Sequence, residues 1–282
     1  MLTNSQSELR FLQNVYYGGN LMSVRLLLTD EAWAEIAPIL AKLKSRAGSP
    51  PVLSDRLFIE AVLYRARTGL PWRDLPKDFG RWDAVYNRFR RWEVRGVWRR
   101  LWEHLQTEDC PMTCHLFIDA TIVRAHQHAA GALKKYGGQA AQALGRSRGG
   151  LSTKIHAGCR DERTGIAVVL TAGQCHESPV FETVFAQVPP EPSLTHAIMD
   201  KAYDSDDIRE YLLKHDIVPV IPPKSNRIVP LDYDKHLYKF REKVERFFNN
   251  LKQFRCIATR YEKLSQTFLA LIHLVAVWII IK

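Results

Sequence analysis

The stretch H-L-F-I-D-A-T, residues 115–121, gives the strongest indication of the fold. Its apolar core, Leu116 to Ile118, is rich in strand formers and is followed directly by the acid Asp119. A second run, H-A-I-M-D at 196–200, has the same form and ends in Asp200. Because side chains at the carboxyl ends of sheet strands tend to line a crevice, we expect the two carboxylates to share one site.

The sequence around these two runs predicts a mixed α/β layer fold. Three strand-like runs come first, and helix and strand then alternate, which is typical of a sheet covered by helices. The expected strands are Leu116 to Val123, Leu151 to Ala157, Ile166 to Ala172, His196 to Met199 and Ile217 to Ile221. The expected helices are Ser178 to Gln187 and Ser205 to His215, with Asp204, Ser205 and Asp206 as possible caps.

A later segment, residues 238–252, supplies a third acid. On a helix with about 100° per residue, Tyr238, Arg241, Glu245 and Lys252 fall within one arc of about 60°. Apolar residues form a separate stripe beside this arc, so Glu245 stands at the edge of a core. On its own it could be a surface carboxylate paired with its basic neighbours.

Asp119 and Asp200 change this interpretation, because a helix laid across the sheet would bring Glu245 to them. Close carboxylates repel one another, and hard divalent cations with oxygen ligands relieve that repulsion. The three acids therefore predict a metal site. Two rival ligands are weaker: Glu242 lies about 60° further round the helix, and Asp204 is better explained as a helix cap.

The N-terminal part of the chain, from Thr29 to about Leu105, has a helical pattern and is rich in tryptophan and arginine. One interpretation is a small helical bundle with a tryptophan core and solvated arginines. The other is a helix-turn-helix-like DNA-binding domain, and both can hold together. The candidate DNA contacts are Arg81, Arg88, Arg90, Arg91 and Arg95. Residues 1–21 lack a sustained periodic pattern of apolar residues, and we expect a poorly ordered extension there.

Composition is consistent with a globular protein that binds a polyanion. The 282 residues carry a formal net charge of +10, and lysine and arginine side chains favour binding to a phosphate backbone. The five cysteines lack the spacing of a disulfide framework, which indicates a reduced, cytoplasmic location. No export signal is evident, and the apolar run 268–281 is shorter than the ~20 residues that span a bilayer. We expect it to be a buried terminal helix and expect no membrane partner.

The spacing Tyr, two residues, Arg, three, Glu, six, Lys at 238–252 resembles the YREK signature of DDE-type bacterial insertion-sequence transposases. The segments I-D-A-T-I-V-R-A-H from 118 and M-D-K-A-Y-D from 199 resemble the two Asp blocks of this family. Residues 145–158 and 173–182 resemble further blocks, and the resemblance covers roughly residues 25–281. One departure is Ala202, where the family usually has Gly; a position with φ > 0 would there add strain of about 1 kcal/mol.

The resemblance implies a ribonuclease-H-like catalytic domain over residues 112–282, preceded by a helical DNA-binding domain over residues 22–108. It implies that Asp119, Asp200 and Glu245 are catalytic and bind two Mg²⁺ or Mn²⁺ ions for cleavage and strand transfer. The partners would be double-stranded DNA, as inverted-repeat ends and target, and a second copy of the chain. The candidate DNA contacts in this domain are Tyr238, Arg241, Lys252, Arg146, Arg148, Lys154 and Lys201.

Several alternatives stay open at this point. Tyr238 could equally be a half-buried aromatic at the core edge, and His126 and His128 could take part in proton transfer or only contact phosphate. The whole chain could also be a DNA-binding derivative that has lost catalysis. A third possibility is a metal-dependent nuclease of the same fold that does not join strands.

Overall fold

The computed structural model describes residues 15–17, 20–22, 24–43, 52–108, 114–138, 140–190, 193–229 and 231–282. Residues 1–14, 18, 19 and 23 lie outside this part, as do residues 109–113, where we expected the boundary between the domains. Within the expected extension, β1 (Val15–Tyr17) and β2 (Asn20–Met22) pair as antiparallel strands. The disorder of residues 1–21 and the division into domains stay predictions.

Helices make up the N-terminal region, as the pattern predicts. They are α1 (Asp30–Leu43), α2 (Asp55–Thr68), α3 (Trp82–Val94) and α4 (Val97–Glu108), with short 3₁₀ turns at Trp72–Asp74 and Lys77–Phe79. Ser54 caps α2, since its side chain accepts a hydrogen bond from the Leu57 amide. Arg95 and Gly96 connect α3 to α4, and Gly96 has the positive φ of 65° that this tight turn needs.

Aromatic rings fill the core of this region. The Trp92 ring lies 5.0 Å from the Phe58 ring and 4.9 Å from the Trp98 ring, measured between centroids. All three side chains are buried, and the distances are those of favourable aromatic pairs. The expectation of a tryptophan core is therefore confirmed.

The sheet has the topology that the resemblance predicts. Its principal strands are β3 (His115–Ala125), β5 (Gly150–Cys159), β6 (Gly165–Ala172), β7 (His196–Met199) and β8 (Val218–Val220). Their order is β6-β5-β3-β7-β8; the first three are antiparallel, and β7 and β8 run parallel to β3. This is the ribonuclease-H-like arrangement. Two short strands extend it: β4 (Gly145–Ser147) pairs with β5, and β9 (Thr259–Arg260) pairs with the end of β3.

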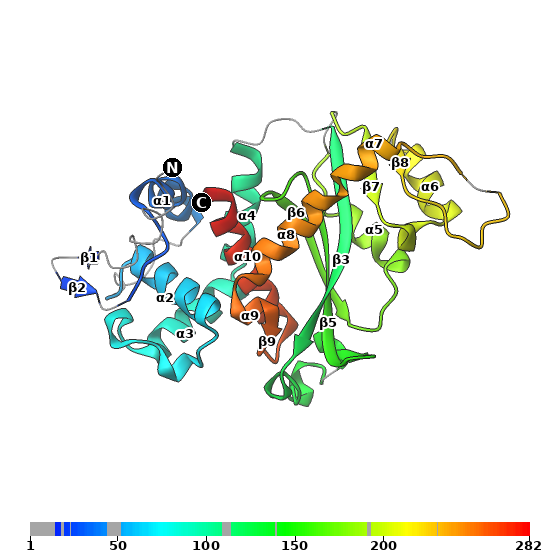
Figure 1. Ribbon diagram of the computed structural model, residues 1–282. Coiled ribbons are helices and arrows are strands. Elements are labelled where there is room, and N and C mark those ends of the chain that lie inside the picture. The colour runs from blue at the N-terminus through cyan, green and yellow to red at the C-terminus, as the bar shows by residue number, and fades with distance from the viewer. Residues whose placement is uncertain are drawn as a thin grey trace, which may run out of the picture.

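Helices cover both faces of the sheet (Figure 1). One face packs on α5 (Phe181–Phe185) and α6 (Asp206–Leu213), which are shorter than the predicted helices. The other face packs on α8 (Glu242–Lys252), which crosses in front of β3. The segment before α8 is α7 (Lys235–Tyr238) and a 3₁₀ turn (Lys239–Arg241), so the single helix expected from residue 238 is tightened at its start.

The C-terminal helices join the sheet to the N-terminal region. The helices α9 (Arg255–Ala258) and α10 (Ser265–Ile281) lie between the sheet and the helices α2 and α3 in Figure 1, and α10 packs on α4. One hydrophobic core runs continuously from the helical region through α10 to the sheet face beneath α8. The buried terminal helix is thus confirmed. No helix in the described part of the chain is long and apolar enough to cross a bilayer.

Candidate active site

Asp119 and Asp200 lie side by side on neighbouring strands. Ile118 of β3 pairs with Met199 of β7, so the next residue of each chain segment is one of the two acids. Side chains alternate along a strand, and Asp119 therefore points to the same face as Phe117, toward α8. Asp200 comes directly after the strand and caps the following turn, because its carboxylate accepts a hydrogen bond from the Ala202 amide.

Helix α8 is held over this face by its apolar side. Val244, Phe247, Phe248 and Leu251 are buried against the sheet and α10. Gly165 of β6 makes room for Phe247: a Cβ atom built on Gly165 would lie 2.4 Å from Phe247 Cζ. This close packing sets the height of α8 above the sheet and so the position of the polar arc that it carries.

Arg241 joins the first acid to the third. Its Nη1 donates to Asp119 Oδ2 at 2.8 Å, and its Nη2 donates to Glu245 Oε1. The Asp119 side chain is 13% exposed and the Glu245 side chain 52%, so the guanidinium spans from the buried floor of the site to its open side. Two carboxylates therefore already share one cation.

Burial dominates the electrostatics of Asp119. It raises the pKa of this carboxyl from 3.8 to about 6, although the Ala120 amide and Arg241 favour the ionised form. The negative charges of Asp200 and Glu177 raise the pKa further. A carboxylate so poorly solvated gains more than an exposed one when a cation approaches.

Lys252 and Tyr238 complete the polar arc. Lys252 Nζ donates to Thr121 Oγ1 at 2.6 Å and to the Ile122 carbonyl at 3.2 Å, so it lies over β3 two residues beyond Asp119. The Tyr238 ring is half-buried and packs against the Tyr233 ring at 5.5 Å. Burial raises the pKa of its hydroxyl, with smaller effects from Arg241 and from both Asp residues. The four residues of the motif thus surround one site.

The donor set has the chemistry of a magnesium or manganese site, since every candidate ligand is a carboxylate. As placed, however, Arg241 lies where Asp119 and Glu245 approach each other. Within the described residues, no group of three or more His, Cys, Asp or Glu side chains is arranged to hold a metal ion. The carboxylates would have to release Arg241 before they could share an ion.

Two family models match most of the chain. Residues 111–280 match the family model described as "Transposase DDE domain", and residues 28–102 match that of the "Putative transposase of IS4/5 family". The chain belongs to the DDE transposase family. It is therefore a DNA transposase, an enzyme that cleaves DNA and transfers strands.

The relatives that resemble this transposase align with less than half of its chain. It is 42% identical to an uncharacterized Sinorhizobium fredii protein, y4sN, over 40% of this chain and 87% of the relative. It is 30% identical to the putative transposase of insertion sequence IS6501 from Brucella ovis, over 44% of this chain and 94% of the relative. Among solved structures, a piggyBac transposase complex with hairpin DNA matches 72% of this chain and 51% of its own, at 15% identity and a TM-score of 0.39.

Some predicted DNA contacts of the transposase are committed to internal bonds. Arg88 is buried, donates to the Leu53 carbonyl and to Asp55, and lies over the Phe58 ring. Lys154 is also buried and donates to the Cys175 carbonyl and to Glu177. These interactions hold both cations away from the surface, and we remove them from the DNA-contact set.

Other predicted contacts differ in exposure. Those open to solvent are Arg81, Arg91, Arg95, Arg146, Arg148 and Lys201. Arg81 pairs with Asp83 at the start of α3, and Arg90 is partly buried and bonded to Glu93 and Thr267. In the described part of the chain, Asp119 and Glu245 form their ion pairs with Arg241 and with none of these exposed cations.

Of the three possible caps, Ser205 caps α6 by accepting a hydrogen bond from the Ile208 amide, and the interpretation of Asp204 as a cap is wrong. The fully buried Asp204 carboxylate instead binds Arg209 and Arg227. These partners account for a pKa lowered to about 2 despite the opposing effect of burial. Glu242, the other rival ligand, is exposed and pairs with Arg246. Neither rival joins Asp119.

Two residues near the acids were not predicted. Glu177 affects the pKa of Asp119, and Tyr203 is fully buried with a hydroxyl whose pKa is raised by burial and by Glu177, Asp119 and Asp200. Both belong to segments that carried the resemblance, which was the available signal. Ala202, the departure from the family pattern, is not among the described non-glycine residues with positive φ, so the strain expected there is absent.

Proposed function

We propose that this transposase cuts the inverted-repeat ends of an insertion sequence, with Asp119, Asp200 and Glu245 as its catalytic residues. The observation that carries the proposal is the double contact of Arg241, which donates to both Asp119 and Glu245. It supports a site in which residues 126 positions apart in the chain act on one bound cation. The register of β3 and β7 supports Asp200 as the third member.

The proposed cofactors are two Mg²⁺ or Mn²⁺ ions, held by these three carboxylates in place of the Arg241 guanidinium. Bound divalent ions would activate a water or a 3′-OH as nucleophile and stabilise the leaving oxygen of the phosphodiester. Asp119 fits the role of a ligand on an observation of its own: burial disfavours its negative charge, and a cation would relieve that cost.

The basic side chains of the polar arc would position the DNA backbone. Arg241, once released from the carboxylates, is close enough to take a phosphate oxygen at the site. Lys252 contacts β3 beside Thr121 and would hold the next phosphate along the strand. The Tyr238 ring is half-buried at the core edge and packs on Tyr233, and its remaining surface would contact a nucleotide near the cleaved bond. Positioning and charge neutralisation are the protein's main tasks in phosphoryl transfer.

The helical region would bind the ends outside the site. The exposed Arg91 and Arg95 at the end of α3 and the exposed Arg81 at its start are the contacts we propose there, with Arg146, Arg148 and Lys201 near the sheet. The net charge of +10 supports binding to DNA as a whole. Synapsis of two ends implies two copies of the chain, so we propose a homodimer on DNA.

The test combines purified protein, Mg²⁺ and a duplex carrying the inverted repeat that flanks the coding frame. The expected products are nicks at the end and strand-transfer products joined to target DNA. Asp119→Asn, Asp200→Asn and Glu245→Gln should each nearly abolish both while end binding persists. Glu242→Gln is the matched control on α8 and should retain activity. Nicks without joining would indicate a nuclease, and no cleavage by the unaltered chain would indicate a derivative that has lost catalysis.

A further inference from the structure

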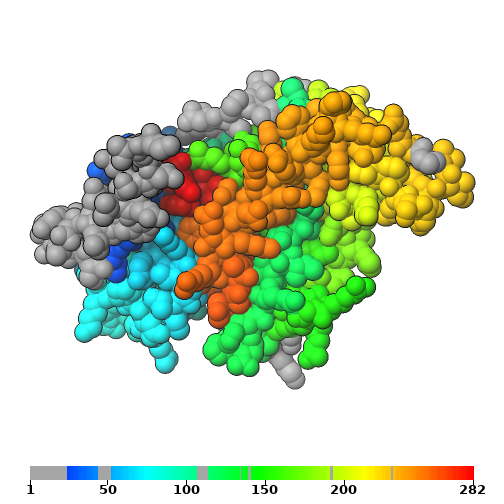
Figure 2. All heavy atoms as spheres, in the orientation of Figure 1, coloured from blue at the N-terminus to red at the C-terminus, as the bar shows by residue number. Residues whose placement is uncertain are grey.

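Arginine side chains gather at the tip of the hairpin that β4 and β5 form. Ser147 pairs with Gly150, and the two residues between them make a tight turn. Arg146 and Arg148 belong to this hairpin, and both are exposed. In Figure 1 the end of β3 and the start of β5 lie at the lower end of the sheet, and green atoms of this region reach the lower edge of the molecule in Figure 2. The hairpin tip is therefore open to solvent.

A third arginine reaches this tip from the neighbouring strand. Arg124 of β3 is exposed and pairs with Ser152 of β5, three residues after Gly149. Gly149 makes room for its guanidinium, because a Cβ atom built on Gly149 would lie 1.7 Å from Arg124 Nη2 and 1.8 Å from Nη1. Only glycine leaves the guanidinium in this position. We call Arg124, Arg146 and Arg148 the arginine tip.

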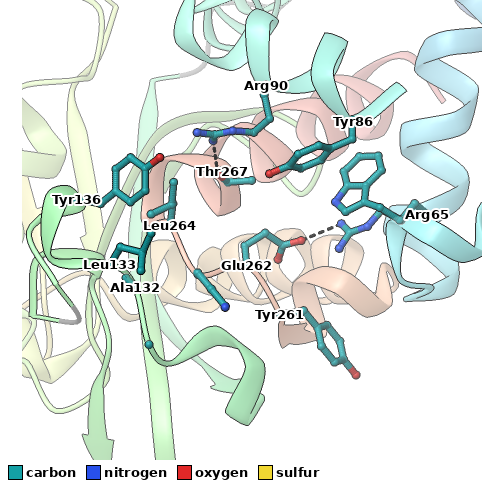
Figure 3. A pocket seen from close by; sticks show the side chains of 13 residues that line it. Arg65, Tyr86, Arg90, Ala132, Leu133, Tyr136, Tyr261, Glu262, Leu264 and Thr267 are labelled. Carbon is teal, nitrogen blue, oxygen red and sulfur yellow. Dashed lines mark hydrogen bonds and ion pairs between the residues drawn. The ribbon is translucent and has the colours of Figure 1, made fainter. Parts of the chain in front are cut away.

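The charges of the arginine tip are not neutralised from within the protein. None of its three side chains forms an ion pair with an Asp or Glu side chain in the described part of the chain. Arginines in the interior differ: in Figure 3 Arg65 is bonded to Glu262, and Arg90 is bonded to Thr267. An anion can therefore bind the arginine tip without displacing a carboxylate.

The chemistry of the arginine tip favours an extended polyanion. A guanidinium is planar, always charged and weakly hydrated, and its N–H groups match the oxygens of a phosphate. A small anion is best held in an enclosed site, whereas several guanidinium groups on a projecting hairpin can follow a chain of phosphates. Each lysine or arginine that neutralises a backbone phosphate also releases a counterion, which favours binding. The phosphate backbone of DNA fits this surface.

The strand β3 connects the arginine tip rigidly to the acids. Arg124 follows Asp119 by five residues on this strand, a distance of about 17 Å at ~3.3 Å per residue. Side chains alternate along a strand, so Arg124 leaves β3 on the face opposite to Asp119. The arginine tip is thus separate from the phosphate that the acids hold, and it can only position DNA that extends beyond the acid site.

We propose that the arginine tip binds the phosphate backbone of DNA outside the acid site, with Gly149 as the residue that keeps Arg124 in place. Arg124 is a positioning residue, since it touches neither the acids nor the bond that they cut. Transposon ends and target DNA share this backbone chemistry, so either can supply the ligand. The proposal rests on the proposed action on DNA and adds Arg124 and Gly149 to the residues that hold it.

The test measures the affinity of the full-length protein for two labelled duplexes at several salt concentrations, in EDTA so that no DNA is cut. One duplex carries the inverted-repeat end, and the other has an unrelated sequence. Arg124→Ala should lower the slope of log affinity against log salt by about 1 and weaken binding by about 8-fold at 0.1 M salt, the effect of one lost phosphate contact. A loss confined to the end duplex assigns the arginine tip to the transposon end. A loss on both duplexes assigns it to DNA of any sequence, as target DNA is.

Gly149→Ala should lower the slope as Arg124→Ala does, because the added methyl group displaces the guanidinium, and it should add little in the double variant. Arg124→Lys keeps the charge and should keep the slope. Lys214→Ala removes an exposed cation that is paired with Glu210 on α6, and it should change the slope little. Equal thermal unfolding of all variants shows that they are folded. An unchanged slope for Arg124→Ala on both duplexes would overturn the proposal. DNA that the unaltered chain binds but never cuts with Mg²⁺ would overturn only the proposed function.

Discussion

Replacing Asp119 by Asn should make the folded protein more stable at neutral and alkaline pH, although it removes a catalytic carboxylate. The reason is burial: the pKa of Asp119 lies at about 6 in the folded chain, above the ordinary 3.8. A shift of about two pKa units corresponds to about 3 kcal/mol at 1.36 kcal/mol per unit. This is the free energy by which folding disfavours the ionised carboxylate, with the favourable effect of Arg241 already included.

The sign of the pH dependence follows from proton linkage. Between pH 3.8 and about pH 6 the folded state binds more protons at Asp119 than the unfolded state does, so stability falls as the pH rises through this window. Above it the full cost of about 3 kcal/mol is present. Asparagine resembles the neutral carboxyl group in shape and carries no charge. The advantage of Asp119→Asn should thus be about 3 kcal/mol at pH 8 and roughly half of that at pH 5.

Urea unfolding at pH 5 and pH 8, in EDTA, measures this difference for both proteins. Adding Mg²⁺ at pH 8 should then stabilise the unaltered chain more than the variant, because only the former offers the full set of ligands to the ion. Glu242→Gln, which alters an exposed carboxylate at the start of α8, should change stability little. An Asp119→Asn protein that is less stable at pH 8, or that gains equally at both pH values, would refute this reasoning.

Two further predictions concern packing around the sites. Gly165→Ala should destabilise the fold by about 1 to 3 kcal/mol and reduce DNA cleavage, because the added methyl group displaces Phe247 and with it α8. An unchanged melting temperature and unchanged cleavage activity would show that the position of α8 does not depend on this contact. Glu262→Gln should cost about 3 to 5 kcal/mol in urea unfolding, because it leaves the buried Arg65 charge unpaired. Glu103→Gln breaks the exposed ion pair with Arg99, and an equal loss of unfolding free energy in this variant would contradict the role of burial.

The sequence predicted the parts of the fold that depend on local pattern. The apolar runs that precede Asp119 and Asp200 became β3 and β7, and Ser205, one of the possible caps, begins α6 as expected. The two acids were expected at the carboxyl ends of their strands, and this is correct for Asp200 only, because β3 continues past Asp119 to Ala125. They still lie side by side, since Ile118 pairs with Met199 in neighbouring parallel strands. Glu245 could be placed at a core edge from the helical period alone.

The local sequence pattern could not predict which charged side chains pair over long distances in the chain. Arg88 and Lys154 looked like surface cations, yet their partners lie about 20 to 35 residues away and draw them into the interior. Asp204 had the sequence context of a cap, but Arg209 and Arg227 converge on it from the helix and a later loop. A residue's type fixes its charge, while tertiary structure decides which partner neutralises it.

Arg241 is the most instructive case. Its spacing from Glu245 predicted an ordinary helical ion pair, and the second bond to Asp119 depends on how α8 crosses β3. That crossing is set by Phe247 on Gly165, two residues that no local pattern connects. The same geometry gives the site a guanidinium where we propose divalent ions.

Titration of the full-length protein with Mn²⁺, followed by calorimetry and by the electron paramagnetic resonance of the free ion, tests the central proposal most directly. The unaltered chain should bind Mn²⁺, Arg241→Gln should bind it more tightly because the competing cation is gone, and Asp119→Asn and Glu245→Gln should each lose the ion. Mn²⁺ binding that is the same in all four proteins would contradict a metal site made by these acids.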